Sequence, residues 1–200
     1  MYMQKTVTWW LLVINTVVFF LQMLFGKQFT TLFALTPSLA FRGYFWQFVT
    51  YMFLHADFSH IFLNMFTLLM FAPRIEHEMG SKRFLIYYLI CGIGSGLFHI
   101  AFTGISNVPM VGASGAIYGV LTAFGVMFPN AIVLVMGIIP MKALKSVIVF
   151  GVIQFLLGIM VPGSAIAYFG HVGGIVVGLI LLYKFDFRKR REWQWFWEFY

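Results

Sequence analysis

The sequence predicts an all-α fold, a polytopic membrane protein whose six transmembrane helices form one domain. Of its 200 residues, 62% are hydrophobic and 10% are charged, and the mean hydropathy is +0.92. Soluble domains carry about a quarter charged residues, so this chain has too few charges to cover a surface that faces water. At ~20 residues per span, its apolar residues suffice for about six helices with short loops. The composition therefore excludes an ordinary soluble domain.

Six apolar segments follow one another along the chain. The expected helices are 7–25, 58–72, 84–102, 114–128, 143–161 and 169–182. The first follows Lys5 but has no small-residue cleavage site after it, so we expect a retained helix and not a signal peptide. Pro73 and Pro129 are expected to end the second and fourth helices. The aromatic segment 26–57 is expected in the membrane interface, and 131–141 is too short to span.

Lysine and arginine are distributed unevenly between the two sides of this arrangement. With both termini in the cytoplasm, 11 of the 13 Lys and Arg lie inside, and only Lys27 and Arg42 lie outside. The net charge of +7 therefore indicates orientation and not a nucleic-acid partner. We predict a membrane domain over 1–183 and a basic, aromatic cytoplasmic tail over 184–200 that binds anionic lipid. The compact form without appended domains favours a bacterial plasma membrane.

Polar residues gather where the second, fourth and sixth helices begin. In the predicted orientation all three helices start on the outer side, so their first turns share one depth. The polar residues there are His60, Asn64, Ser114, Tyr118 and His171. The two pairs are each four residues apart, which places each pair on one helix face. Because polar side chains are costly in lipid, this cluster is a candidate functional site.

Ser114 has the surroundings of a nucleophile. It opens a helix, where unpaired backbone N–H groups favour an anion. Gly112 and Gly115 on either side allow a substrate to approach closely. A serine needs a general base within hydrogen-bond reach, and His171 is the candidate.

Two further features support this chemistry. Gly174 and Gly178 form a GxxxG face just below the histidine, which lets the sixth helix pack closely on the fourth. His60 and Asn64 can donate hydrogen bonds to an oxyanion beside the backbone N–H of Ser114. The helix 114–128 is about 22 Å long against a hydrocarbon core of ~30 Å. The preceding loop is therefore expected to dip into the membrane and line a water-filled cavity.

Three motifs, in this order, carry a family resemblance: His60-x-x-x-Asn64, then Gly112-Ala113-Ser114-Gly115 with Tyr118, then His171-x-x-Gly174-x-x-x-Gly178. Together they resemble a rhomboid intramembrane serine protease, over roughly residues 7–182. The resemblance implies a dyad of Ser114 and His171, an oxyanion hole involving His60 and Asn64, and a Tyr118 ring that supports His171.

Two other positions bear on this resemblance. Glu76 is similar to a structural acid of the family. Trp46-Gln47 departs from the family, whose members often have Trp-Arg in the first loop. The departure concerns the structure of the loop and leaves the dyad unaffected.

Each of these residues also has a plain structural interpretation. Ser114 alone fits a helix cap, His171 alone a bond to a carbonyl, and Tyr118 simple packing. His60 and Asn64 can merely tie the loop to the helix end. A zinc site on His55, Asp57 and His60 is disfavoured because HExxH is absent and the two histidines do not share a helix face. Cys91 and His99, with the nearby Gly92, Gly94 and Gly96, are expected to pack in the core of the third helix.

The predicted function is therefore an intramembrane serine endopeptidase that cleaves transmembrane segments of other membrane proteins near the outer leaflet. Its partners are those substrates and the lipid bilayer. The residues imply no cofactor, no metal and no nucleic acid. One alternative is a non-catalytic rhomboid-like protein that binds or escorts membrane helices. A second is a small transporter or channel, suggested by polar groups near the midplane.

Overall fold

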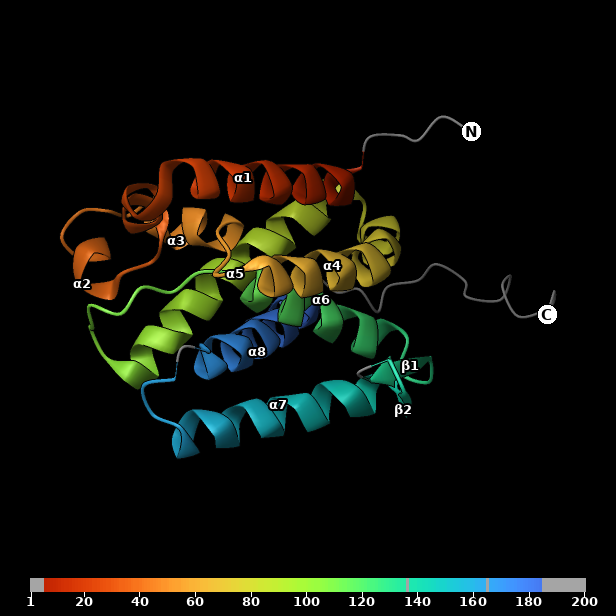
Figure 1. Cartoon of the computed structure of the whole chain (residues 1–200). Helices are drawn as coiled ribbons and strands as arrows, with labels where there is room; N and C mark the ends of the chain where they lie inside the picture. The colour runs from red at the N-terminus through yellow and green to blue at the C-terminus, as the bar shows by residue number, and fades with distance from the viewer. Residues whose placement is uncertain (1–5, 136, 165, 185–200) are drawn as a thin grey trace.

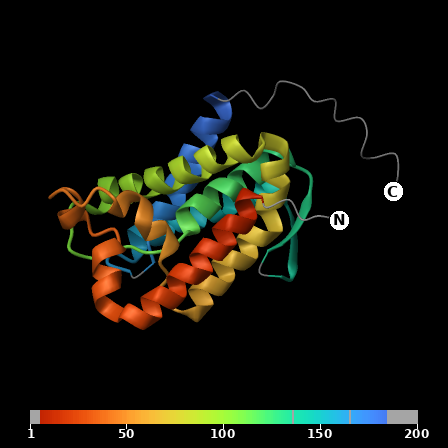
Figure 2. The ribbon, with the colours of Figure 1, turned by 90° about the horizontal axis from the view of Figure 1, so that it is seen from above.

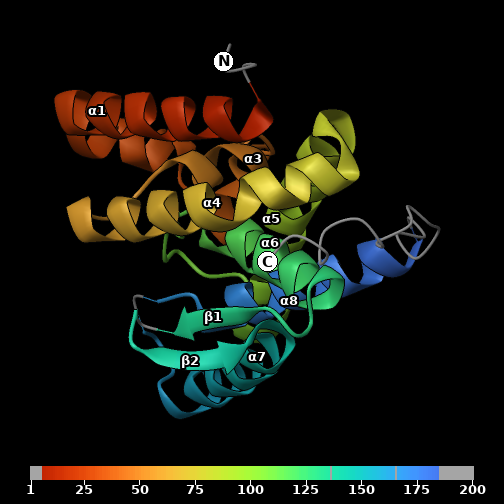
Figure 3. The same ribbon diagram turned by 90° about the vertical axis from the view of Figure 1, so that its right-hand side faces the viewer.

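The computed structural model describes residues 6–135, 137–164 and 166–184 (Figure 1). Its long helices are α1 (Val7–Phe33), α4 (Phe58–Met79), α5 (Ser81–Thr103), α6 (Ser114–Met127), α7 (Ala143–Met160) and α8 (Tyr168–Lys184). Seen from one side, α1 and α4 form the first layer, α5, α6 and α8 the middle, and α7 the last (Figure 3). Four of them, α1, α4, α5 and α7, are long and apolar enough to cross a membrane, and α6 and α8 are shorter apolar helices. The prediction of a helical protein with apolar spans is confirmed.

The outer helices expose large apolar side chains. Phe20 on α1 is 63% exposed, Phe62 on α4 is 56% exposed and Ile148 on α7 is 59% exposed. Long runs of such side chains on the outside of a protein suit contact with lipid and not with water. The surface thus agrees with the composition, because the apolar residues that a core cannot hold face outward.

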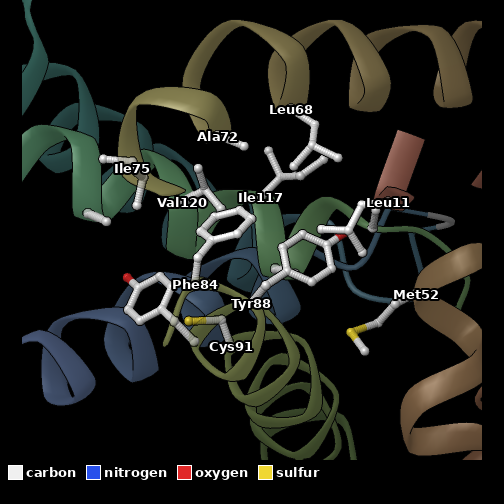
Figure 4. Close-up of a cluster of buried hydrophobic side chains, with 14 of the residues drawn as sticks. Leu11, Met52, Leu68, Ala72, Ile75, Phe84, Tyr88, Cys91, Ile117 and Val120 are labelled. Atoms are coloured by element: carbon white, nitrogen blue, oxygen red, sulfur yellow. The ribbon is translucent and has the colours of Figure 1, made fainter. Parts of the chain in front are cut away.

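A buried cluster joins the inner faces of the helices (Figure 4). Leu68 from α4, Tyr88 from α5 and Val120 from α6 are fully buried in it. Leu11 from α1 and Met52 from the short η1 helix (Tyr51–Phe53) also belong to this cluster. This cluster packs α6 between α4 and α5, which holds the beginning of α6 in the interior.

Glu76 binds the beginning of α1 to the end of α4. Its carboxylate accepts hydrogen bonds from the backbone N–H groups of Val7 and Thr8, both at 2.8 Å, and from the Thr8 hydroxyl at 2.7 Å. The Ser81 hydroxyl donates a fourth bond at 2.5 Å. Helix N-termini leave backbone N–H groups unsatisfied, and a carboxylate is a strong acceptor for them. Figure 2 shows α1 and α4 lying side by side along their length.

The helix α4 corrects one predicted boundary. Pro73 was expected to end it, but the helix continues to Met79, and Gly80 at φ 77° makes the turn into α5. Proline in a helix interior removes one backbone hydrogen bond. Ile75 and Glu76 beyond it are buried, and their contacts outweigh the local preference. In α1, by contrast, helical geometry breaks at Gly26 (φ 61°), next to the predicted end.

The segment between α1 and α4 contains the short helices α2 (Pro37–Ala40) and α3 (Gln47–Thr50), followed by η1. Gln47 is fully buried and ties this segment together. Its Oε1 accepts from the Thr36 N–H at 3.0 Å, and its Nε2 donates to the carbonyls of Thr31 and Leu32 at 3.3 and 3.2 Å. An uncharged side chain therefore closes the loop, at the position where the resemblance described above would lead us to expect arginine.

A small sheet departs from the predicted all-α fold. Strands β1 (Ile132–Val135) and β2 (Ile139–Lys142) pair antiparallel, with Ile132 opposite Lys142. The β-branched residues of this segment favour extended backbone, and Gly137 at φ 76° suits the turn. The predicted tail 184–200 lies outside the described residues except for Lys184, which ends α8.

Candidate active site

Small residues bring α6 and α8 into close contact. A Cβ atom added at Gly174 would collide with the carbonyl oxygen of Gly115 and lie 2.9 Å from its carbonyl carbon. One added at Gly178 would lie 3.2 Å from the Cα of Gly119. The GxxxG face of α8 therefore packs against the backbone of α6, and only glycine fits at this approach.

The helix α5 donates hydrogen bonds to both α6 and α8. The Ser95 hydroxyl donates to the carbonyl of Gly170 on α8 at 2.7 Å. The Tyr87 hydroxyl donates to the carbonyl of Gly119 on α6, also at 2.7 Å. Both side chains are buried, where a satisfied hydrogen bond contributes to a unique packing. The relative position of α6 and α8 is thus set by three helices.

This packing brings Ser114 and His171 together. The Ser114 Oγ lies 2.8 Å from the Nε2 of His171, which is hydrogen-bond distance for a nucleophile and its base. Ser114 is the first residue of α6, so its own N–H is among those without an intrahelical partner. Gly112, two residues before Ser114, has φ 125°, a conformation that a residue with a side chain rarely adopts.

The other nitrogen of His171 is also engaged. Its Nδ1 lies 2.8 Å from the Oε1 of Gln154 on α7. The Nε2 of Gln154 donates in turn to the Tyr118 hydroxyl at 3.0 Å. The ring of Tyr118 stacks on the imidazole, with the centroids 4.5 Å apart and the planes 21° apart. Four side chains from α6, α7 and α8 therefore form one connected group.

His60 and Asn64 of α4 line the same cavity as Ser114. A Cβ atom added at Gly112 would lie 2.8 Å from the His60 Nε2 and 3.7 Å from the Ser114 Oγ, so the imidazole sits directly over this glycine. The His60 Nδ1 accepts from the Ala56 N–H at 3.3 Å, and the Asn64 amide donates to the His60 carbonyl at 3.0 Å. The His60 Nε2 therefore faces Gly112 beside Ser114.

The loop before α4 holds His60 in place. His55 is 1% exposed, and its ring meets that of His60 edge to face at 5.1 Å. Gln22 anchors the His55 backbone with two hydrogen bonds of 2.9 and 3.0 Å. Burial lowers the pKa of His55 to about 3, so the ring is neutral near pH 7. Hydrogen bonds from the Ser59 hydroxyl and the His60 N–H lower the pKa of Asp57, which caps α4.

A cavity of about 700 Å³ opens in front of the dyad. It runs along α6 between α4 and α7 and reaches β1. Its walls are mostly apolar, and most of the polar lining residues, among them His60, Asn64, Ser114 and His171, lie near the beginning of α6. Representative lining residues are Leu63, Phe71, Leu121, Val133, Val147 and Phe150.

Two residues depart from the sequence-based expectations. Gln154 was not predicted as a site residue, although a long polar side chain in an apolar helix is a signal that could have indicated it. His99 was expected in the core, but it is partly exposed and lines the cavity. Cys91 is fully buried, as expected. Gly92 also packs as predicted, because a Cβ atom there would collide with Met52.

Comparison with known proteins gives consistent matches. A family model described as the rhomboid domain matches residues 42–186. RHOMBOID-like protein 4 of Arabidopsis thaliana is 32% identical over 149 residues, 74% of this chain and 36% of that protein. YdcA of Bacillus subtilis is 29% identical over 154 residues, 76% of this chain and 73% of YdcA. Rhomboid protease GluP of the same organism is 31% identical over 144 residues, 70% of this chain and 26% of GluP. The chain thus spans most of YdcA and a much smaller part of the other two.

Proposed function

Because this chain belongs to the rhomboid family, we propose that it is an intramembrane serine endopeptidase that cleaves transmembrane segments of other membrane proteins near the outer leaflet. The observation that carries the proposal is the 2.8 Å contact between the Ser114 Oγ and the His171 Nε2 at the wall of a cavity. A serine hydroxyl and a neutral imidazole at this distance can act as the nucleophile and the general base of acyl transfer.

The reaction proceeds in two halves. His171 accepts the proton of Ser114 while the Oγ attacks the carbonyl carbon of the scissile peptide, which forms a tetrahedral oxyanion. The imidazolium then donates that proton to the leaving amine as the C–N bond breaks, and an ester on Ser114 remains. Water then attacks the ester while His171 accepts a proton from that water. The imidazolium donates this proton to the Ser114 oxygen as the ester bond breaks and the carboxylic acid leaves.

The oxyanion needs preorganised donors. The N–H of Ser114 belongs to the first turn of α6, and the His60 Nε2 faces Gly112 beside the nucleophile. Asn64 has a second amide hydrogen besides the one that bonds to the His60 carbonyl. These three groups form the oxyanion hole, and removing one such donor costs ~100-fold or more in rate.

The six helices cross the membrane, with both termini in the cytoplasm. The loops that precede α4 and α6 are joined by backbone hydrogen bonds from Gly112 to Tyr51 at 2.9 Å and between Leu35 and Met110. This joint supports a shared outer side for the beginnings of these helices. At 14 residues α6 is about 21 Å long, so Ser114 lies below the outer boundary of a ~30 Å hydrocarbon core. The charge asymmetry supports the same orientation.

The substrate occupies the cavity between α4 and α7. Apolar side chains such as Leu63, Phe71 and Phe150 line its length, and the dyad lies near the beginning of α6, where most of its polar lining residues gather. A transmembrane segment that loses helical structure near its end can place a peptide bond there while its apolar remainder stays along α6. Polar backbone exposed in this way is tolerated where it lies in a protein cavity.

Labelling by a serine-directed fluorophosphonate tests this proposal. The wild-type chain in detergent micelles is expected to label, whereas Ser114→Ala is expected not to label and His171→Ala to label at least ~100-fold more slowly. Ser38→Ala is the control, since this serine of α2 is absent from the cavity lining and its hydroxyl bonds only to Asn107 among the described residues. Absence of labelling in the folded wild type, or equal labelling of Ser114→Ala, would refute the dyad.

The test also separates the two alternatives. An unlabelled chain that still binds transmembrane peptides would support a protein that escorts membrane helices. An ion or solute flux that survives Ser114→Ala would support a transporter.

A further inference from the structure

We propose that Gln154 is a positioning residue that holds His171 in the tautomer with its proton on Nδ1. The inference rests on the proposed function, because it assigns Gln154 a role in preparing the base of the dyad. It depends on two contacts of the same imidazole, the 2.8 Å contact of Nδ1 with the Gln154 Oε1 and the 2.8 Å contact of Nε2 with the Ser114 Oγ.

A neutral imidazole has one N–H donor and one lone pair. If Nδ1 carries the proton and donates it to Oε1 of Gln154, Nε2 has the lone pair that a base needs to accept the Ser114 proton. In the opposite tautomer Nε2 would carry the proton, and His171 would be unable to deprotonate Ser114. The hydrogen bond on one side of the ring therefore decides the chemistry on the other side.

Gln154 is itself held in place. Its Nε2 donates to the Tyr118 hydroxyl at 3.0 Å, which leaves Oε1 directed at His171. Tyr118 also covers one face of the imidazole by stacking. Ring rotation and tautomer are therefore constrained together, by one side chain from α6 and one from α7.

Gln154 acts through His171 and not on the substrate. It is absent from the lining of the cavity within the described part of the chain, whereas His171 is part of that lining. In serine proteases of the triad type a buried carboxylate performs this task. An amide accepts the same hydrogen bond without a negative charge, which avoids the desolvation penalty of an ion inside the membrane.

Two substitutions of Gln154 show whether it acts by accepting a hydrogen bond from His171 or only by filling space beside it. Gln154→Leu keeps most of the volume and removes the acceptor. Gln154→Glu keeps the acceptor, and an ionised glutamate can only accept. The matched control is Ile153→Val, a conservative change at the neighbouring position of α7, which is 43% exposed.

The first readout is the rate of fluorophosphonate labelling as a function of pH, in the full-length chain in micelles. Gln154→Leu is expected to label about 10- to 100-fold more slowly. Gln154→Glu is expected to retain labelling and to shift the pH profile upward, because a carboxylate stabilises the imidazolium. The titratable groups that share the cavity with His171 are Asp57, His60, His99 and Tyr118, and they are unchanged in both variants.

The second readout is independent of activity. Nitrogen NMR of labelled histidine in the same preparation is expected to show the Nδ1–H tautomer of His171 in the wild type and a mixture in Gln154→Leu. Unchanged labelling, pH profile and tautomer in a folded Gln154→Leu would overturn the inference, as would a Gln154→Glu variant as slow as Gln154→Leu with no shift of its profile. A wild type that fails to label refutes the proposed function alone, since the NMR readout still decides the role of Gln154.

Discussion

Gly174→Ala is expected to separate the dyad without touching either of its members. The added methyl group would collide with the carbonyl oxygen of Gly115 and lie 2.9 Å from the carbonyl carbon. Carbon atoms in good contact are ~3.5–4.0 Å apart, so α6 and α8 must move apart by about 1 Å. Backbone atoms form the obstacle, and no side-chain rotation relieves it.

The same movement acts on the contact between Ser114 and His171. Adding about 1 Å to their 2.8 Å separation exceeds hydrogen-bond distance. A misplacement of about 1 Å in an active site can cost ~100-fold in rate. Overpacking at the interface is also expected to lower the free energy of unfolding by about 1–3 kcal/mol.

The assay compares second-order rates of fluorophosphonate labelling, with unfolding in detergent measured on the same samples. Gly151→Ala is the matched control, because a Cβ atom there meets only the end of the Ile175 side chain, at 3.3 Å. We expect Gly151→Ala to label close to the wild-type rate and Gly174→Ala to label about 100-fold more slowly. A folded Gly174→Ala variant with the wild-type rate would refute the reasoning that this glycine contact sets the dyad.

Two predictions concern stability. Glu76→Ala removes the acceptor of the Val7 and Thr8 N–H groups. The free energy of unfolding is therefore expected to fall by about 3 kcal/mol. An unchanged midpoint in a detergent unfolding titration would contradict this prediction. The second prediction concerns Asp57, whose pKa in the folded state lies below the unfolded value of ~3.9. Its carboxylate therefore stabilises the fold above that pH. This contribution is lost as the pH falls through the folded-state pKa. The difference in unfolding temperature between wild type and Asp57→Asn should therefore shrink below about pH 4, and a constant difference would argue against the cap.

Local sequence signals predicted most of the helices, because apolar runs and helix breakers act within a few residues. The end of α6 and the beginning of α4 agree closely with the predicted limits. The boundary at Pro73 was wrong, since burial of Ile75 and Glu76 outweighs the local effect of proline. The hairpin formed by β1 and β2 was also missed, because a short apolar run does not by itself distinguish strand from helix.

Candidate site residues were predictable to the extent that their chemistry stands out. Ser114 and His171 are polar groups in apolar helices, and the glycine spacing on α8 indicates close packing. Gln154 escaped notice because it is far from both in the sequence and belongs to no local motif. Its partners became visible only when α7 was placed beside α8.

Composition and spacing by themselves determined that the chain is helical, that lipid surrounds it and that polar side chains meet where three helices begin. These properties depend on the solvent preference of each residue and on the helix repeat, which are local. Tertiary structure alone decided which atoms touch. It placed the His171 imidazole between Ser114 and Gln154, Gln47 at the centre of the first loop and His99 in the cavity wall. Such contacts depend on separations of a few ångströms between distant segments, which only the packing of whole helices fixes.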